Sequence, residues 1–484
     1  MATTTRGREG RNAPQTPGIR RTTSRRQRSN ESNAAVRGDT SAGDVGPRAG
    51  AAGAAAAGSG STTAPGTPPA KTGLRPLSRT GRTLALPLRQ LVLLELALAA
   101  AGLGWLAGGA WLIVGPVVAV LLLLFAVVRR RGRAGLDWLT AVLAFRARTR
   151  RAAAFGAPAP APGASPESAP DPALAPVAEN VPGFGPYTYV DRDRRTVGML
   201  GDGTFLTAVV RVEASGEALR PASGARALPL SLLGDCLEVD DIVLESAQLV
   251  QQVRAAPAPH LPEQSAARRT HAALQLQAAA PALRMTWIAL KLDPRAAHEA
   301  VEARGGGVAG AQRCLVRVAD HVASRVTGAG FRAAVLDQEE LNSALATATC
   351  ARTVHAPDPA GRPRRSAETA RVWTCDDRWH TTYAVGRWPE LGRAATPLPR
   401  VLSALAEVPS YATTVSLTVR RGPHRGATAV AGHVRVTGDT DTQLISVRKE
   451  LERMAGSAKV ALVRLDREQL PGVLATLPLG GASR

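Results

Sequence analysis

A long apolar run, from Leu91 to Val128, dominates the hydrophobic pattern of this 484-residue chain, and Glu95 is its one charged residue. A membrane span takes about 20 apolar residues, so the run is about twice too long for a single crossing helix. Glycines between residues 102 and 109 favour a break in the middle of the run. We therefore expect a two-span transmembrane helical hairpin within residues 85–130, with spans at 91–106 and 110–128.

Charged and aromatic residues around the run indicate how such a hairpin would lie. Arginines precede and follow the run and none stands in its turn, so the positive-inside rule places both termini in the cytoplasm. Trp105 and Trp111 would lie at the membrane–water interface near the turn, and Pro116 would bend the second span. The Glu95 carboxylate could reach the interface or pair with Arg89. A hairpin buried in a soluble core is the alternative, whereas a signal peptide fits poorly because the run is too long and a basic cluster follows it.

The segments on either side of the expected hairpin are basic. Residues 1–90 hold 15 basic and 4 acidic residues, and residues 129–151 hold 8 and 1, so these segments contain most of the net charge of +21. Basic segments beside a membrane are attracted to anionic lipid. Because aromatic residues are few and do not alternate with basic ones, we expect membrane lipids rather than nucleic acid as partners.

Composition divides the first part of the chain further. Residues 1–84 are rich in Thr, Ser, Gly, Pro and Arg and nearly lack large apolar residues, so we expect a disordered tail. Apolar residues on one side of residues 131–151 predict an amphipathic juxtamembrane helix. Residues 152–182 are rich in Pro and Ala and predict a semi-extended linker.

The remaining sequence predicts an α/β region on the cytoplasmic side of the membrane. In residues 183–350, short apolar runs typical of strands alternate with helical patterns, such as the apolar face of residues 311–326. A polar link at 351–370 precedes a second α/β module at 371–480, in which residues 413–436 have the pattern of a β-hairpin. We expect a mixed sheet flanked by helices. The sequence shows no clear internal repeat.

Motifs that would indicate an enzyme or a metal centre are missing from the sequence. There is no nucleotide-binding glycine loop followed by lysine, no nucleophile elbow, no metal-spaced group of His and Cys, and no CxxC pair among the four cysteines. Asp202 in a Gly-Asp-Gly turn, and Cys375-Asp376-Asp377 beside His380, are the candidates for polar chemistry, but ordinary turns explain both. We expect no catalytic residue, cofactor, metal or small-molecule substrate.

Three short motifs, and their order along the chain, point to a known family. The first is Val197-Gly198, followed by Asp202-Gly203 and Arg211-Val212; the second is His380 with Tyr383, Arg387, Trp388 and Pro389; the third is Thr476 to Gly480, with Pro478. Together with the apolar run they extend over most of residues 85–480. In this order the chain resembles EccE, a membrane component of the actinobacterial type VII (ESX) secretion system.

The resemblance implies a structural, non-catalytic subunit that anchors and scaffolds a secretion complex in the inner cell membrane. Its partners would be the family's other components, EccB, EccC and EccD, of which EccC is the ATPase. Two alternatives stay open at this point. One is a membrane-tethered enzyme with a transferase-like α/β domain, and the other is a lipid-binding membrane adaptor outside secretion.

Overall fold

The computed structural model describes residues 88–127, 129–130, 133–154, 171–214, 228–254, 266, 283–352, 364–389, 398–422 and 427–481. The tail expected at 1–84, residues 155–170 of the expected linker and Val128 lie outside these ranges. The sequence pattern of residues 264–280 predicts a helix, and these residues, apart from residue 266, also lie outside the described ranges.

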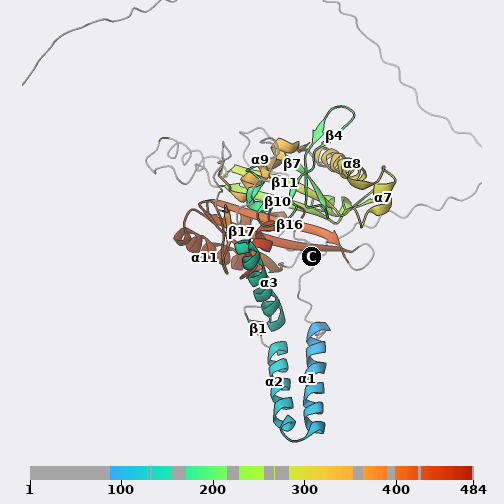
Figure 1. Ribbon diagram of the computed structural model, residues 1–484. Coiled ribbons are helices and arrows are strands. Elements are labelled where there is room, and N and C mark those ends of the chain that lie inside the picture. Colours follow the sequence, from blue (N-terminus) through green and yellow to red (C-terminus); the bar gives the residue numbers. More distant parts are fainter. Residues whose placement is uncertain are drawn as a thin grey trace, which may run out of the picture. The chain divides into compact units, whose positions relative to one another are not determined.

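Residues 88–127 form two antiparallel helices, α1 (Leu88–Ala107) and α2 (Trp111–Val127) (Figure 1). They are joined at Gly108 and Gly109, whose φ angles of +64° and +57° are accessible to glycine without steric cost. The helices also approach each other closely at two glycines. A Cβ built on Gly104 would lie 2.7 Å from Gly115 Cα, and one built on Gly115 would lie 2.7 Å from Gly104 Cα.

The expected transmembrane hairpin is wrong. In the part of the chain that the structure describes, no helix is both long enough and apolar enough to cross a membrane. The turn divides the apolar run, and α2 keeps 17 residues, including Pro116, where a span takes about 20. The 20 residues of α1 include Arg89 and Glu95.

The described residues contain one large sheet of twelve strands. These are β3 (Gly185–Pro186), β6 (Met199–Gly201), β7 (Leu206–Ala214), β10 (Ser246–Arg254), β11 (Leu283–Leu292), β12 (Phe331–Val335), β13 (Ser366–Glu368), β14 (Trp373–Cys375), β15 (Arg378–Arg387), β16 (Ala412–Arg421), β17 (Thr428–Gly438) and β18 (Ala461–Arg464). The strand order is β13-β14-β15-β17-β16-β10-β11-β7-β6-β3, with β12 also beside β7 and β18 also beside β15. Every pairing in it is antiparallel, so the expected mixed sheet is wrong.

Three further pairs of strands, each two residues long, stand apart from this sheet. They are β1 (Arg129–Arg130) with β2 (Arg133–Ala134), β4 (Tyr189–Val190) with β5 (Thr196–Val197), and β8 (Glu238–Val239) with β9 (Ile242–Val243).

Residues 206–335 form a first module with the element order β-α-β-β-α-β. Helix α5 (Ser231–Asp235) follows β7, and α7 (His298–Glu302) and α8 (Gly307–Gly328) connect β11 to β12. Both β11 and β12 are antiparallel to β7 and lie at its opposite edges, so they are parallel to each other without being neighbours. This split β-α-β unit gives the ferredoxin-like order β10-β11-β7-β12. It also explains why alternating strands and helices produced no parallel pair.

Residues 378–464 repeat this arrangement as a second module. Its elements are β15, α10 (Leu398–Ala406), β16, β17, α11 (Asp441–Ser457) and β18, and its strand order is β16-β17-β15-β18. Each module also has a short strand that pairs with the beginning of its first strand, β6 with β7 and β14 with β15. The structure thus shows a duplication of topology that the sequence does not reveal.

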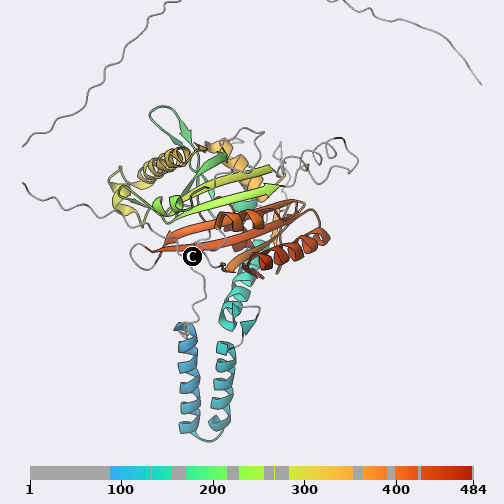
Figure 2. The same ribbon diagram turned by 180° about the vertical axis from the view of Figure 1, so that it is seen from behind.

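The two modules join through β10 and β16. These strands pair over eight residues, from Ala247 opposite Val419 to Arg254 opposite Ala412. In Figures 1 and 2, β10 (green) and β16 (orange) run side by side at the junction.

Helices cover both faces of the sheet. The first face, as we call it, packs against α5, α7, α8, α10 and α11. The second face packs against α4 (Ala175–Ala178), α9 (Gln338–Thr349), α12 (Gln469–Leu474) and residues 475–481. The apolar side predicted for residues 311–326 is confirmed, because Leu315, Val318 and Val322 of α8 are fully buried.

Helix α3 (Gly135–Ala154) covers most of the segment expected as an amphipathic helix at 131–151, and it contacts the second module of the same chain. The Arg148 guanidinium donates two hydrogen bonds to the Glu368 carboxylate in β13, at 2.8 and 3.0 Å, and one to the Arg467 carbonyl at 2.7 Å. The Arg467 side chain in turn lies over the Trp138 ring, 5.5 Å from its centroid. The Glu368 side chain is only 6% exposed, so the Arg148–Glu368 pair is well shielded from water.

Candidate functional site

A pocket of about 250 Å³ opens beside the turn between β6 and β7 in the first module. Its lining residues are Asp202, Thr204, Phe205, Glu245, Lys291, Asp293 and Arg295. Parts of two predicted family motifs meet at Lys291. The Asp202-Gly203 turn borders the pocket, and the C-terminal motif, in which Pro478 is buried, packs Gly480 against the Lys291 side chain.

The Lys291 side chain is 2% exposed and is held by two contacts. Its Nζ lies 3.0 Å from Glu245 Oε2 and 4.3 Å from the centroid of the Phe205 ring. A buried ammonium needs such a partner, because removing it from water is costly, and an aromatic face adds to the attraction. The Glu245 carboxylate is also 3.8 Å from Arg420. The Lys291 ammonium is therefore part of a structural ion pair and is not presented as a free nucleophile.

Asp202 holds the turn that places Phe205 over Lys291. Its Oδ1 accepts hydrogen bonds from the Thr204 N–H at 2.8 Å, the Thr204 hydroxyl at 2.6 Å and the Phe205 N–H at 3.3 Å. Gly203 follows with φ +87°, an angle that favours glycine. The observed contacts of Asp202 are those of a turn residue.

Two other motif glycines allow close approaches of the backbone. Gly198 donates from its N–H to the Leu336 carbonyl at 3.0 Å, and a Cβ there would lie 2.4 Å from the Asp337 carbonyl oxygen. Gly480, with φ +85°, donates to Gln248 Oε1 at 2.8 Å, and a Cβ there would lie 2.4 Å from Lys291 Cβ. A side chain at either position would force the backbones apart.

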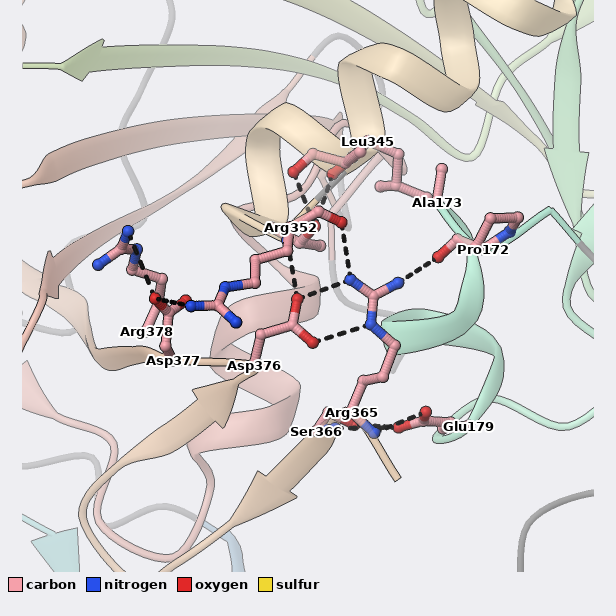
Figure 3. Close-up of polar contacts among 12 residues, drawn as sticks. Pro172, Ala173, Glu179, Leu345, Arg352, Arg365, Ser366, Asp376, Asp377 and Arg378 are labelled. Carbon is pink, nitrogen blue, oxygen red and sulfur yellow. Dashed lines mark hydrogen bonds and ion pairs between the residues drawn. The ribbon is translucent and has the colours of Figure 1, made fainter. Parts of the chain in front are cut away.

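The turn between β14 and β15 carries the acidic pair that the sequence singled out, and arginines surround it (Figure 3). The Arg365 Nε and Nη2 donate to the Asp376 carboxylate at 2.8 and 2.6 Å, and the Arg352 N–H donates to it at 2.8 Å. The Asp377 carboxylate lies 3.1 Å from Arg352 Nη2 and 3.6 Å from Arg378 Nη2. Burial raises the pKa of Asp376, but the Arg365 and Arg352 hydrogen bonds outweigh it, so the pKa is lowered overall.

Arg365 also connects the β14–β15 turn to distant parts of the chain (Figure 3). Arg365 Nη1 donates to the Pro172 carbonyl at 2.6 Å, while its N–H donates to Glu179 at 2.9 Å. The Glu179 carboxylate also accepts from the Ser366 hydroxyl at 2.8 Å. This network fastens the segment before β3 to the beginning of β13. Its charges are paired with one another, which is typical of a structural cluster.

His380 and Cys375, the other members of the predicted cluster, point into the core. The His380 side chain is fully buried, with Nδ1 2.9 Å from Thr437 Oγ1 and its ring centroid 5.0 Å from that of Trp373. Burial lowers the pKa of His380 well below its usual value and raises the pKa of the Cys375 thiol, so both are neutral at pH 7. Across the described ranges, no group of three His, Cys, Asp or Glu residues is placed to hold a metal ion.

The second family motif spans the end of β15. The Tyr383 hydroxyl donates to Glu452 Oε1 at 2.8 Å, and burial raises the pKa of Tyr383 to about 12. Trp388 is buried, and a Cβ on Gly432 would lie 2.4 Å from its ring. These two aromatic residues therefore pack β15 against α11 and β17. Arg387 is exposed and Pro389 is half-buried.

The residues named for the expected membrane spans lie on α1 and α2. Glu95, Trp105, Trp111 and Pro116 are exposed, Leu91 lies in the first turn of α1, and Val128 is outside the described residues. A functional role of the family-motif residues stays a prediction.

Sequence reasoning missed the residues that hold these sites together, Lys291 and Arg365. A signal for Lys291 was present, because a lysine in the otherwise apolar stretch MTWIALKL has to be paired if that strand is central. Arg365 lies in the segment expected to be a polar link, where an arginine is expected to be exposed to solvent.

Comparison with protein families bears on the resemblance. Residues 280–385 match the family described as Putative type VII ESX secretion system translocon, EccE. The chain carries an EccE domain. The resemblance to this family is thereby confirmed over β11 to β15, which join the end of the first module to the beginning of the second. The EccE family implies a component of the type VII secretion translocon. No curated protein matches the chain.

Proposed function

We propose that this chain is a structural subunit of a type VII (ESX) secretion complex, without catalytic activity of its own, and that it scaffolds the translocation machinery at the inner cell membrane. The EccE match at residues 280–385 carries the proposal. The partners would be EccB, EccC and EccD together with membrane lipids, and ATP hydrolysis would be left to EccC.

The described contacts agree with a scaffold. Asp202, Glu245 and Lys291 at the pocket, and Arg365 and Asp376 at the β14–β15 turn, are engaged in ion pairs and hydrogen bonds. One sheet continues through both modules, which favours a rigid platform. The Arg148–Glu368 pair connects α3 to that platform.

The globular modules would lie on the cytoplasmic side. All four cysteines are free and buried. Free thiols are the norm in a reducing compartment, whereas exported proteins commonly pair them.

The test is to purify the tagged full-length chain from its native host in mild detergent, identify the proteins that accompany it and measure the particle. We expect a large particle that contains the multi-domain ATPase and other translocon components. A chain recovered alone, under conditions that preserve other membrane complexes, would contradict the proposal.

A pair of variants tests the contribution of α3. Glu368→Gln removes the charge that holds Arg148, and we expect it to lower the yield of the particle several-fold. Glu450→Gln, which removes an exposed partner of Arg453 on α11, is the matched control and should leave the yield unchanged. Equal yields for the two variants would show that the α3 contact does not matter for assembly.

A further inference from the structure

A fully buried arginine, Arg435, lies on the second face of the sheet, in β17. Its Nη2 donates to the carbonyl of Ala348 in the last turn of α9 and to Thr414 Oγ1 at 3.3 Å. The end of a helix carries only a partial negative charge, and a hydroxyl carries no net charge. No carboxylate of the described residues forms an ion pair with Arg435, so its positive charge lacks a full counter-charge.

Several hydrogen-bonding atoms around Arg435 have no partner in the described part of the chain. They include the nitrogens Arg435 Nε and Nη1, Trp373 Nε1 and His380 Nε2, and the hydroxyl oxygen Thr382 Oγ1. Strand pairing brings these residues together: Arg435 is opposite Thr382, two residues from His380 on the same face of β15, and His380 is opposite Trp373 in β14. The Trp373 and His380 ring centroids are 5.0 Å apart. The unpaired atoms therefore come from adjoining positions on three neighbouring strands.

The energetic cost of this arrangement calls for a ligand. Each buried donor without a partner costs about 1–3 kcal/mol, and a buried charge without a counter-charge costs more. Burial lowers the pKa of Arg435 to about 10, so the guanidinium is still charged at pH 7. If the Thr437 hydroxyl donates to His380 Nδ1, the neutral imidazole carries its proton on Nε2. Arg435, Trp373 and His380 then supply N–H groups and a positive charge, the requirements of an anion.

We infer that Arg435, Trp373 and His380 bind a chloride ion in the interior of the second module. The class of anion follows from the burial, since these three side chains are at most 1% exposed and a monatomic ion needs less space among packed side chains than a polyatomic one. Chloride supplies the missing counter-charge and accepts the unpaired N–H groups. It also fixes Arg435, which holds the end of α9. This inference is independent of the proposed role in secretion.

The experiment is thermal unfolding of the purified full-length chain in sodium chloride and in sodium gluconate of equal ionic strength. A ligand that binds only the folded state stabilises it by mass action. Above the dissociation constant, each tenfold rise in chloride should raise the folding equilibrium constant about tenfold, with no such rise in gluconate. Arg435→Gln should abolish the difference. Arg421→Gln, which removes an exposed arginine paired with Glu238, is the control and should keep it.

Two further measurements keep the inference testable if Arg435→Gln does not fold. Trp373→Phe keeps an aromatic ring but removes the indole N–H, and it should shift the chloride dependence to several-fold higher concentration. Crystals of the full-length chain soaked in bromide should show an anomalous peak beside Arg435. Equal unfolding temperatures in the two salts, with no bromide peak, would overturn the inference and leave water as the occupant.

Discussion

The first and second modules have the same topology, but the chemistry of their second faces differs. In the first module that face carries Val209, Trp287 and Ala289, which pack into an apolar cluster with α9. In the second module the corresponding strands place His380, Thr382, Thr414, Arg435 and Thr437 there, and all five are fully buried. The first module also buries polar side chains on this face, Thr207, Gln248, Gln252 and Lys291, so the two modules differ in how much of the face is apolar.

The difference between the two modules follows from the parts of the chain that cover the second face of each module. Irregular backbone and helix ends bring carbonyl and N–H groups that need partners once they are buried. Over the second module and the junction, Arg435 donates to the Ala348 carbonyl, and Ser416 and Gln248 donate to the Ala475 carbonyl, each at 2.8 Å. These buried polar side chains therefore satisfy carbonyl groups at the C-terminal ends of α9 and α12.

The largest effect on stability should come from truncating a large apolar side chain on the second face of the first module. Trp287 is 3% exposed in β11, and Trp287→Ala should lower the free energy of unfolding by about 3–5 kcal/mol, because it removes buried ring surface and leaves a cavity. Chemical denaturation of the full-length chain measures this. Arg332→Ala, on the exposed side of β12, is the control and should change it little. A loss below about 1 kcal/mol for Trp287→Ala would mean that this face is not a core.

Breaking the buried ion pair at the β14–β15 turn should have the next largest effect. The side chains of Arg365 and Asp376 are 10% and 13% exposed, and Arg365→Met leaves the carboxylate without its main partner. We expect a loss of about 2–4 kcal/mol, somewhat reduced by the remaining access to water. The double variant Arg365→Met with Asp376→Asn should lose less than the single one, and a double variant that loses more would contradict the pairing.

The same pair predicts a response to acid. The pKa of Asp376 is lowered in the folded state, so the stabilisation is present above its unfolded pKa of about 3.9 and is lost as the pH falls through the lower folded value. Denaturation midpoints measured between pH 5 and pH 2 should show this loss. Asp376→Asn should show a smaller slope than the wild type, and an unchanged slope would exclude the assignment.

Mildly acidic pH should lower the stability of the chain through His433, in β17 of the second module. Burial and the nearby Arg420 lower the pKa of His433 to about 4. Between about pH 6.5 and pH 4 the unfolded chain binds a proton that the folded one does not, so stability falls with falling pH, by up to about 1.4 kcal/mol per unit. His433→Gln should flatten this part of the profile. His298→Gln, on an exposed residue of α7, should not.

The smallest effects should come from the ion pairs on the first face of the first module. Arg317 of α8 pairs with Asp240 at 3.1 Å, with side chains 63% and 51% exposed. Arg317→Ala should cost less than about 1 kcal/mol, because water and salt screen such pairs. A larger loss in urea titrations would show that these pairs act together as a network.

Local elements could be predicted from the sequence where one side of an element is apolar. The helix expected at 311–326 lies within α8, and the hairpin expected at 413–436 is β16 with β17. The helix that follows this hairpin is α11, and the Thr440 hydroxyl caps it by accepting the Gln443 N–H at 3.2 Å. In each case the structure depends on residues that are close in the sequence, so the local sequence pattern predicts it.

Pairing and burial over long distances could not be predicted in this way. The order of the strands depends on β11 and β12 flanking β7, which no local pattern encodes. β13 was missed because its three residues stand in a polar segment and pair only with β14. Polar residues alternate along β17 as on a solvent-facing side, yet Arg435 and Thr437 are fully buried. At the candidate site the Asp202 turn was visible, but its partner Lys291 comes from another strand.

The junction of β10 and β16 bears on how such a chain could arise. An antiparallel pair of equivalent strands has the geometry of an interface in a two-fold symmetric dimer, where the same edge serves both partners. An ancestor with one module could have built this sheet from two identical copies. Once both are encoded in one gene, each copy is free to change its own second face. Fusion also ensures that β10 and β16 pair with each other and not with a strand of another molecule. This matters because an unpaired edge strand promotes aggregation.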